Sequence, residues 1–213
     1  LVKAGQFKKA EKELEKLEGD LVGQQIQEAK SEDTYRPKVI KRFAIATIDK
    51  SDKFGVLVYN KANQKHLHTA KRKAFLGDGD KKIWTIYEDN FSPNGWVPVL
   101  DFIHAVEYVW DAAKLSTDTE PKCWGKYIEY VVLVWQGRVS TVMRRIDKTI
   151  EELNCHKKTK NIKEKIENLV SIKNYFQNNH TKMKYNEYRK ERLPISSCHV
   201  ESLIKQFNIR VKS

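Results

Sequence analysis

The sequence is poor in cysteine. Its 213 residues include three, Cys123, Cys155 and Cys198, which are odd in number, widely spaced and without a Cys-x-x-Cys pair. A disulfide framework is typically built from an even set of cysteines, and a cysteine zinc site from closely spaced pairs. We therefore expect three reduced thiols, with neither a disulfide framework nor a zinc site.

Long apolar runs are also missing. No window approaches the roughly 18 uninterrupted apolar residues of a membrane span, and the mean hydropathy is -0.66 with 32% charged residues. The first residues mix lysines and glutamates with no apolar centre, unlike a signal peptide. We therefore predict a water-soluble cytoplasmic protein with no membrane partner, whose 40% hydrophobic content is enough to bury a core.

Acidic residues are outnumbered by basic ones. Forty Lys and Arg against 28 Asp and Glu give a formal charge of +12. Such a balance favours polyanionic partners, because neutralising phosphates releases their condensed counterions. Nucleic acid is the expected partner, and a merely solvated lysine-rich surface is the alternative.

Hydrophobic spacing predicts an α/β region followed by helices. Short apolar runs predict strands at 42–48, 73–76 and 97–101, and helical patterns lie between them at 53–66 and 83–87. Alternating strands and helices are typical of an α/β sheet.

The rest of the chain has mainly helical spacing. An amphipathic stripe over 3–18 predicts an N-terminal helix, and another helix begins at about His104. Apolar positions recur at helical spacing over 124–153 and 162–176, on either side of a polar break. The simplest interpretation is an all-helical insertion.

Asp78 stands directly after an apolar strand and between Gly77 and Gly79. Ligands of α/β sheets bind at the carboxyl ends of strands, and flanking glycines let metal or phosphate approach closely. An ordinary Gly-Asp-Gly turn is the alternative.

Asp101 closes the next strand, and His104 follows at the start of a helix. His104 and Glu107 can meet on one helix face at the i, i+3 spacing. The histidine could bind a metal, or it could be held by hydrogen bonds and brace the strand end.

The last segment of interest begins at Leu193. Pro194 and the serines after it predict a loop and a helix start, which places Glu201 in the early turns of a helix. The helix dipole alone can explain a glutamate at such a position.

Three segments together resemble, in order and spacing, three signatures of DDE transposases of the IS-Kra group of bacterial insertion sequences. They are Phe75-Leu-Gly-Asp-Gly-Asp-Lys-Lys-Ile-Trp84, Val99-Leu-Asp-Phe-Ile-His-Ala-Val-Glu-Tyr108 and Leu193-Pro-Ile-Ser-Ser-Cys-His-Val-Glu-Ser202. The middle one is the most specific, because Asp101 and His104 fit the D-x-x-H pattern of related DDE transposases. The resemblance runs from about Arg42 to the end of the chain.

The resemblance implies a ribonuclease-H-like α/β core with a large all-helical insertion. It divides the chain into an N-terminal helical segment (1–34), the first part of the core (35–110), the insertion (111–192) and a C-terminal core helix (193–213).

The resemblance also implies a reaction and a site. Asp78 corresponds to the second catalytic aspartate and Glu201 to the catalytic glutamate, both as metal ligands, with Asp101 and His104 in support. Such carboxylates bind two Mg²⁺ or Mn²⁺ ions, which activate the attacking water or 3′-hydroxyl and stabilise the leaving oxygen.

The chain departs from the family at three places. The first-strand aspartate has no counterpart, Ser196-Ser197-Cys198 replaces Gly-Ser-Gly, and the sequence stops where relatives continue through a basic tail. We therefore expect a truncated or internally deleted member, whose strand transfer is weakened or supplied by an intact relative.

DNA, as transposon ends and target, is the expected partner, and the protein could form a homo-oligomer. Sequence-independent phosphate contacts are predicted for Arg138, Arg144, Arg145, Lys157, Lys158, Lys160, Lys205 and Arg210. Two alternatives remain open. One is a non-catalytic DNA-binding or assembly module derived from a transposase, and the other is a metal-dependent nuclease outside transposition.

Overall fold

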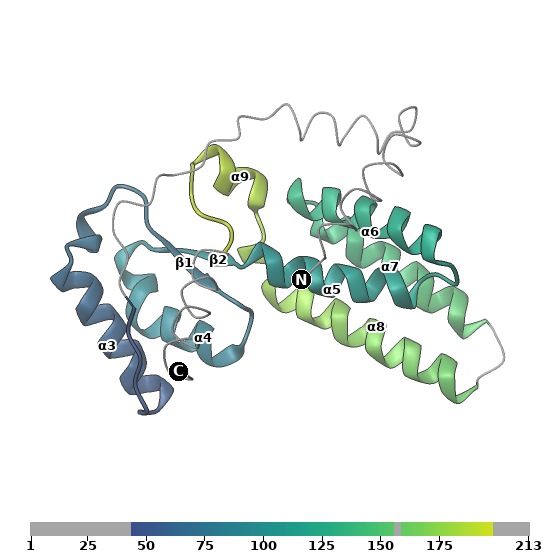
Figure 1. The fold of residues 1–213 in the computed structure, drawn as a ribbon, viewed down its shortest axis with the longest axis horizontal. Helices are drawn as coiled ribbons and strands as arrows, with labels where there is room; N and C mark the ends of the chain where they lie inside the picture. The colour runs from purple at the N-terminus through teal and green to yellow at the C-terminus, as the bar shows by residue number, and fades with distance from the viewer. Residues whose placement is uncertain (1–43, 156–158, 198–213) are drawn as a thin grey trace, which may run out of the picture. The chain divides into compact units, whose positions relative to one another are not determined.

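The computed structural model describes residues 44–155 and 159–197, and this part of the chain is mostly helical (Figure 1). Its elements in chain order are α3 (Ser51–Gln64), η1 (Leu67–Thr69), β1 (Ala74–Gly77), α4 (Lys81–Ile86), η2 (Tyr87–Phe91), η3 (Ser92–Asn94), β2 (Val97–Leu100), α5 (Phe102–Leu115), α6 (Glu120–Trp135), α7 (Val139–Asn154), α8 (Lys160–Asn179), η4 (His180–Lys182) and α9 (Tyr185–Lys190). No helix of these residues is both long and apolar enough to cross a membrane.

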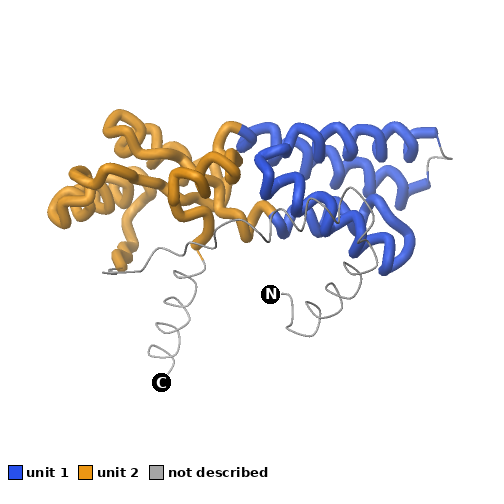
Figure 2. The backbone as a smooth tube through the Cα atoms, turned by 90° about the horizontal axis from the view of Figure 1, so that it is seen from above, with its two compact units in different colours: residues 1–35, 106–180 blue, residues 36–105, 181–213 orange. Residues whose placement is uncertain are grey.

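The chain divides into two compact units (Figure 2). Of the described residues, unit 1 contains 106–155 and 159–180, and unit 2 contains 44–105 and 181–197. Unit 2 is therefore assembled from two stretches that are far apart in the sequence.

Unit 2 contains the sheet, in which β1 and β2 pair in parallel with Gly77 opposite Leu100. The amide of Asp101 extends this ladder by donating to the Gly77 carbonyl at 2.8 Å. In Figure 1, α4 lies on one side of the two strands and α9 on the other. The strand ends are thus held between helices of the same unit.

The core of unit 2 is aromatic. Phe91 is buried, and its ring centroid lies 4.9 Å from that of Phe75 and 5.2 Å from that of Trp96. Gly55 lets α3 come close to this core, because a β-carbon there would lie 2.9 Å from the side chain of Asn90. Aromatic side chains of this size supply much of the apolar area that a small unit can bury.

Helices α7 and α8 of unit 1 each bury one face. Leu169 and Phe176 of α8 and Val142 and Ile146 of α7 are all fully buried. Their separations of seven and four residues are those of a stripe on one helix face. Between α7 and α8, Lys173 Nζ lies 2.6 Å from an oxygen of Asp147, at the edge of this packing.

The stretch with helical spacing over 124–153 forms parts of two helices, α6 and α7. Gly137 has a φ of 73°, and the amide of Arg138 donates to the Leu133 carbonyl at 2.8 Å. This is the hydrogen-bonding of a Schellman motif, which ends a helix at a left-handed glycine. The helical spacing predicted over 124–153 is thus divided between two helices, because the glycine ends the first one.

The predicted ribonuclease-H-like α/β core, placed over 35–110, is wrong. Within 44–155 and 159–197 the only sheet is the pair β1 and β2. Residues 44–48, the described part of the strand expected at 42–48, form no strand, and Ile48 is fully exposed. An exposed, unpaired segment cannot extend a sheet, and the apolar residues after Asp101 pack as helices. The fold is mostly helical with a small parallel sheet.

The segments expected at the two ends of the chain are described only in part. The helix predicted over 3–18, and with it the segment 1–34, lies outside the described residues. Of the C-terminal segment 193–213, the structure describes residues 193–197, which have no regular secondary structure.

Candidate functional site

Two aspartates follow the two strands at equivalent positions. Gly77 ends β1 opposite Leu100 at the end of β2, so Asp78 and Asp101 are the next residues on adjacent parallel strands. The carboxyl ends of parallel strands are where α/β proteins place ligand-binding groups. The described structure therefore brings these two predicted site residues to the same edge of the sheet.

Asp78 is exposed at this edge. Its Oδ1 accepts a hydrogen bond from the amide of Asp80 at 2.9 Å, and Gly79 between them has a φ of 101°. Asp80 in turn accepts from the amide of Lys82 and caps α4. The turn predicted as the alternative is present, and it leaves the Asp78 carboxylate accessible to solvent.

Asp101, by contrast, is only 2% exposed. Its Oδ1 accepts from the amide of Ile103 and its Oδ2 from the amide of Ser197, both at 2.9 Å. Backbone amides at a helix start stabilise a buried carboxylate through direct hydrogen bonds and the helix dipole. Both oxygens of Asp101 thus accept hydrogen bonds from backbone amides, so the geometry suits a positioning residue better than a metal ligand.

A second contact joins the same two stretches of chain. The Phe102 amide donates to the Ile195 carbonyl at 2.9 Å, one residue beyond Asp101 and two before Ser197. The segment that precedes Glu201 in sequence therefore lies at the end of β2.

Tyrosines of α9 attach this returning segment to β2. The buried Tyr185 donates its hydroxyl to the Leu100 carbonyl at 3.0 Å, and Tyr188 donates to the Pro98 carbonyl at 3.1 Å. The return of the chain to the strand end is consequently supported by side-chain as well as backbone contacts.

The remaining predicted site residues are less closely gathered. His104 is half-buried in the first turns of α5 and Glu107 is exposed on the same helix. Glu201 lies outside the described residues, and among those that are described no group of three or more His, Cys, Asp and Glu is arranged to bind a metal. The part of the chain that the structure describes thus supplies Asp78 and its surroundings, but no complete ligand set.

The link between Asp101 and Ser197 was not predicted from the sequence. An aspartate directly before an amphipathic helix is a standard N-cap signal, which could have indicated the contact with Ile103. No local pattern indicates a partner that follows 96 residues later.

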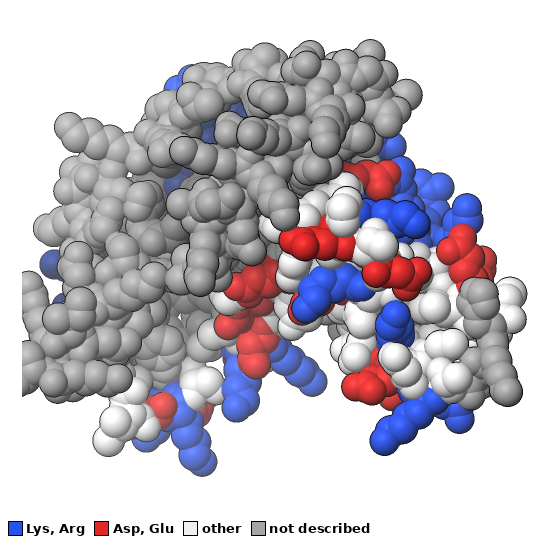
Figure 3. All heavy atoms as spheres, turned by 45° about the vertical axis from the view of Figure 1, so that its right-hand side comes forward, with Lys and Arg blue, Asp and Glu red and all other residues white. Residues whose placement is uncertain are grey.

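The predicted DNA-binding residues of unit 1 do not form a surface of one sign. Arg145 is ion-paired with Glu129, and Arg144 donates to the hydroxyl of Thr141 at 3.3 Å, whereas Arg138 and Lys160 are exposed. The described residues of unit 1 contain nearly equal numbers of basic and acidic side chains. Figure 3 shows blue and red side chains interspersed on one face of the described residues. The remaining four, Lys157, Lys158, Lys205 and Arg210, lie outside the described residues.

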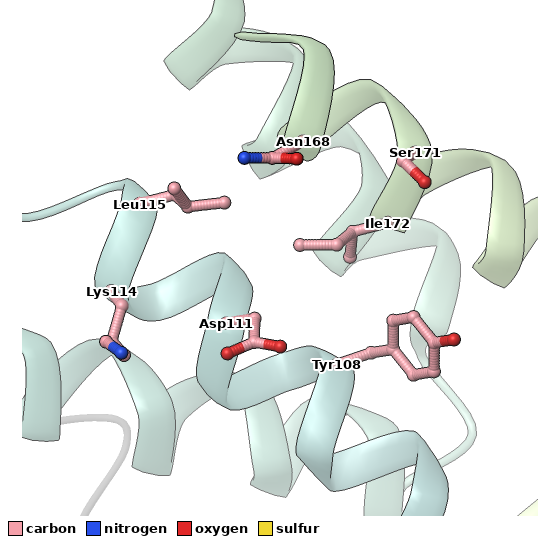
Figure 4. Close-up of a pocket in the computed structure, with 7 residues that line it drawn as sticks. All are labelled: Tyr108, Asp111, Lys114, Leu115, Asn168, Ser171 and Ile172. Atoms are coloured by element: carbon pink, nitrogen blue, oxygen red, sulfur yellow. The ribbon is translucent and has the colours of Figure 1, made fainter. Parts of the chain in front are cut away.

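Unit 1 also contains an open groove of about 330 Å³ between α5 and α8 (Figure 4). Asp111 and Lys114 line it from α5, and Asn168 and Ser171 from α8. Its polar lining therefore includes one acidic side chain, one basic side chain and neutral hydrogen-bonding groups. The groove contains none of the residues predicted to take part in catalysis.

No protein-family model, curated protein or solved structure matches this chain.

Proposed function

We propose that the chain is part of a DDE-type DNA transposase in which Asp78 and Glu201 bind the divalent metal ions of strand cleavage and strand transfer. The observation that carries the proposal is the hydrogen bond from Ser197 to Asp101. It places the chain, four residues before Glu201, at the strand edge that also holds Asp78. Four residues extend at most about 14 Å, which allows Glu201 to reach that edge.

Each residue at the strand ends has a distinct role in this proposal. Exposed carboxylate oxygens suit Mg²⁺ or Mn²⁺, so Asp78 and Glu201 would be the ligands. Metal ions held there would activate water or a 3′-hydroxyl and stabilise the leaving oxygen. Asp101 acts as a positioning residue, because it ties the returning segment to the end of β2. His104 is proposed as a second supporting residue.

The rest of the proposal concerns partners and location. Transposon ends and target DNA would be the substrates, and a homo-oligomer would bring two ends together. A cytoplasmic location belongs to the same proposal. Because the first-strand aspartate has no counterpart in this sequence, strand transfer would be weakened or supplied by an intact relative.

Calorimetry with Mn²⁺ tests the metal site. Asp78→Ala and Glu201→Ala should each weaken binding by tenfold or more, because each removes a carboxylate ligand. Asp80→Ala is the matched control, since it removes the same charge from the same Gly-Asp-Gly-Asp turn. Binding that survives Asp78→Ala unchanged, or that falls equally in Asp80→Ala, would overturn the proposed site.

A non-catalytic DNA-binding or assembly module is the second candidate. It is favoured by the buried carboxylate of Asp101, whose two oxygens accept hydrogen bonds from backbone amides as a structural residue would. DNA binding without any Mn²⁺ binding would support this candidate over the first. A metal-dependent nuclease would share the site, and it would release 3′-hydroxyl ends without joining them to target DNA.

A further inference from the structure

Two basic segments of unit 2 that lie far apart in the sequence meet at one surface. Nη1 of Arg72 donates to the backbone carbonyl of Glu191 at 2.7 Å, across 119 residues of chain. Arg72 precedes β1, and Glu191 follows the last turn of α9. The neighbours of these two residues, Lys71, Lys190 and Arg192, are also exposed and basic. We name the four cations Lys71, Arg72, Lys190 and Arg192 the basic surface.

The backbone at Arg192 is unusual for a side chain of this size. Its φ is 57°, and the next amide, of Leu193, donates to the Tyr188 carbonyl at 2.8 Å, which closes α9 with a Schellman motif. Glycine is the residue favoured at this position, because other L-residues are strained there. The chain thus has a cation where its backbone geometry favours glycine.

The two stretches that form the basic surface, 71–72 and 190–192, contain more basic than acidic side chains. Glu187 lies 3.7 Å from Nζ of Lys184 on the same helix, and Glu191 is the acidic residue within the surface itself. With four basic side chains and one acidic one, these stretches have a positive formal charge, whereas the described helices of unit 1 are nearly balanced.

We propose that the basic surface contacts the phosphates of duplex DNA. Arginine matches phosphate with several donors in a fixed plane, and exposed lysines add point charges. Contacts of this kind position a duplex without selecting its sequence. The inference rests on the proposed function, because the DNA partner is part of that proposal. The four residues of the basic surface differ from all the DNA-binding residues predicted from the sequence.

Salt-dependent binding of the full chain to a fluorescent duplex of arbitrary sequence tests the proposal. The triple variant Lys71→Gln, Lys190→Gln and Arg192→Gln keeps Arg72, which caps α9. Each phosphate contact contributes a slope of about -0.9 to log affinity against log salt. The variant should therefore flatten that slope by about 2 to 3 and weaken binding by tenfold or more at low salt.

The matched control is Arg138→Gln, Arg144→Gln and Lys160→Gln in unit 1, which removes the same charge. A much smaller effect of the control supports the basic surface, and equal effects of the two triples would overturn it. Arg192→Gly separates binding from folding, because it should weaken DNA binding while raising the melting temperature. Glu191→Gln should strengthen binding, because it removes the acidic group of the surface.

The outcome can be separated from that of the proposed function. If the triple variant binds duplex DNA like the parent while Mn²⁺ binding still requires Asp78, the surface is wrong and the proposed metal site stands. If the parent binds no duplex, both the surface and the DNA partner are wrong. A preference for single-stranded RNA that the triple variant abolishes would also overturn the proposal.

Discussion

Ser197 donates its backbone amide to the buried carboxylate of Asp101 at 2.9 Å, from 96 residues further along the chain. The same carboxylate accepts the amide of Ile103 at the start of α5. One side chain thus caps α5 and joins two segments that are 96 residues apart in the sequence, at the end of β2. This contact is the reason for placing a candidate site at that edge of the sheet.

Removing the Asp101 carboxylate should destabilise the protein. Asp101→Ala leaves two amides without their acceptor at a site that is 2% exposed, and we expect it to lower the free energy of unfolding by about 2 to 3 kcal/mol. Asp80→Ala removes an exposed cap of α4 and should cost about 1 kcal/mol. Urea denaturation measures both, and equal costs would contradict the role given to Asp101.

Gly77 should not tolerate a side chain. A β-carbon there would lie 2.8 Å from Ile83 and 3.1 Å from Trp84, so Gly77→Ala should cost about 1 to 3 kcal/mol through overpacking. Gly125 in α6 has no described atom within 4 Å of such a β-carbon. Gly125→Ala should therefore stabilise the protein by about 0.5 to 1 kcal/mol. Thermal unfolding should give a lower melting temperature for Gly77→Ala than for the parent, and a higher one for Gly125→Ala.

Arg192 and Lys190 should respond in opposite ways to replacement by glycine. The φ of 57° at Arg192 is strained for arginine, and Arg192→Gly should stabilise the protein by about 1 kcal/mol. Lys190 lies within α9, where Lys190→Gly should cost up to about 1 kcal/mol. Chemical denaturation of both variants decides the point, and a destabilised Arg192→Gly variant would contradict the strain argument.

The stability of the protein should fall at high pH because two tyrosines are buried. Burial raises the pKa of Tyr130, and likewise that of Tyr188, to about 12. In the unfolded chain their pKa is about 10, so the folded state holds these protons after the unfolded chain has lost them. Their contribution is present below about pH 10 and is lost as the pH rises through 12. Denaturation between pH 7 and 12 should show a flat region and then a decline.

The two tyrosines should differ when each is replaced by phenylalanine. Within the described residues the Tyr130 hydroxyl has no hydrogen-bond partner, so Tyr130→Phe should leave the stability at pH 7 unchanged or raise it. Tyr188 donates to the Pro98 carbonyl at 3.1 Å, and Tyr188→Phe should cost about 1 kcal/mol. Both variants should show a shallower decline at high pH than the parent.

Local patterns predicted the regular elements of unit 2 well. The strands expected at 73–76 and 97–101 and the helix expected at 53–66 are close to β1, β2 and α3. These elements follow from apolar runs between turn residues, which can be identified from one stretch of sequence. The number of strands in a sheet cannot be predicted in this way. A run rich in β-branched and aromatic residues, such as 42–48, forms a strand only if a partner strand is available.

The site was predictable only in part for a related reason. The position of Asp78 after a strand, and of Asp101 after the next, follows from local sequence, and their adjacency follows from parallel pairing. The burial of Asp101 and its link to Ser197 depend on packing between distant segments. The pairing of charges in unit 1 likewise appears only once its helices are folded, because ion pairs such as Arg145 with Glu129 join different helices.

Paramagnetic broadening of amide signals by substoichiometric Mn²⁺ tests the central claim most directly. If Asp78 is a metal ligand at the strand edge beside the returning segment, the amides of Asp78, Gly79 and Ser197 should broaden first. Those of Lys148 and Glu152, an exposed ion pair on α7 in unit 1, should stay sharp. Broadening centred on other carboxylates, with Asp78 and Ser197 unaffected, would contradict the account.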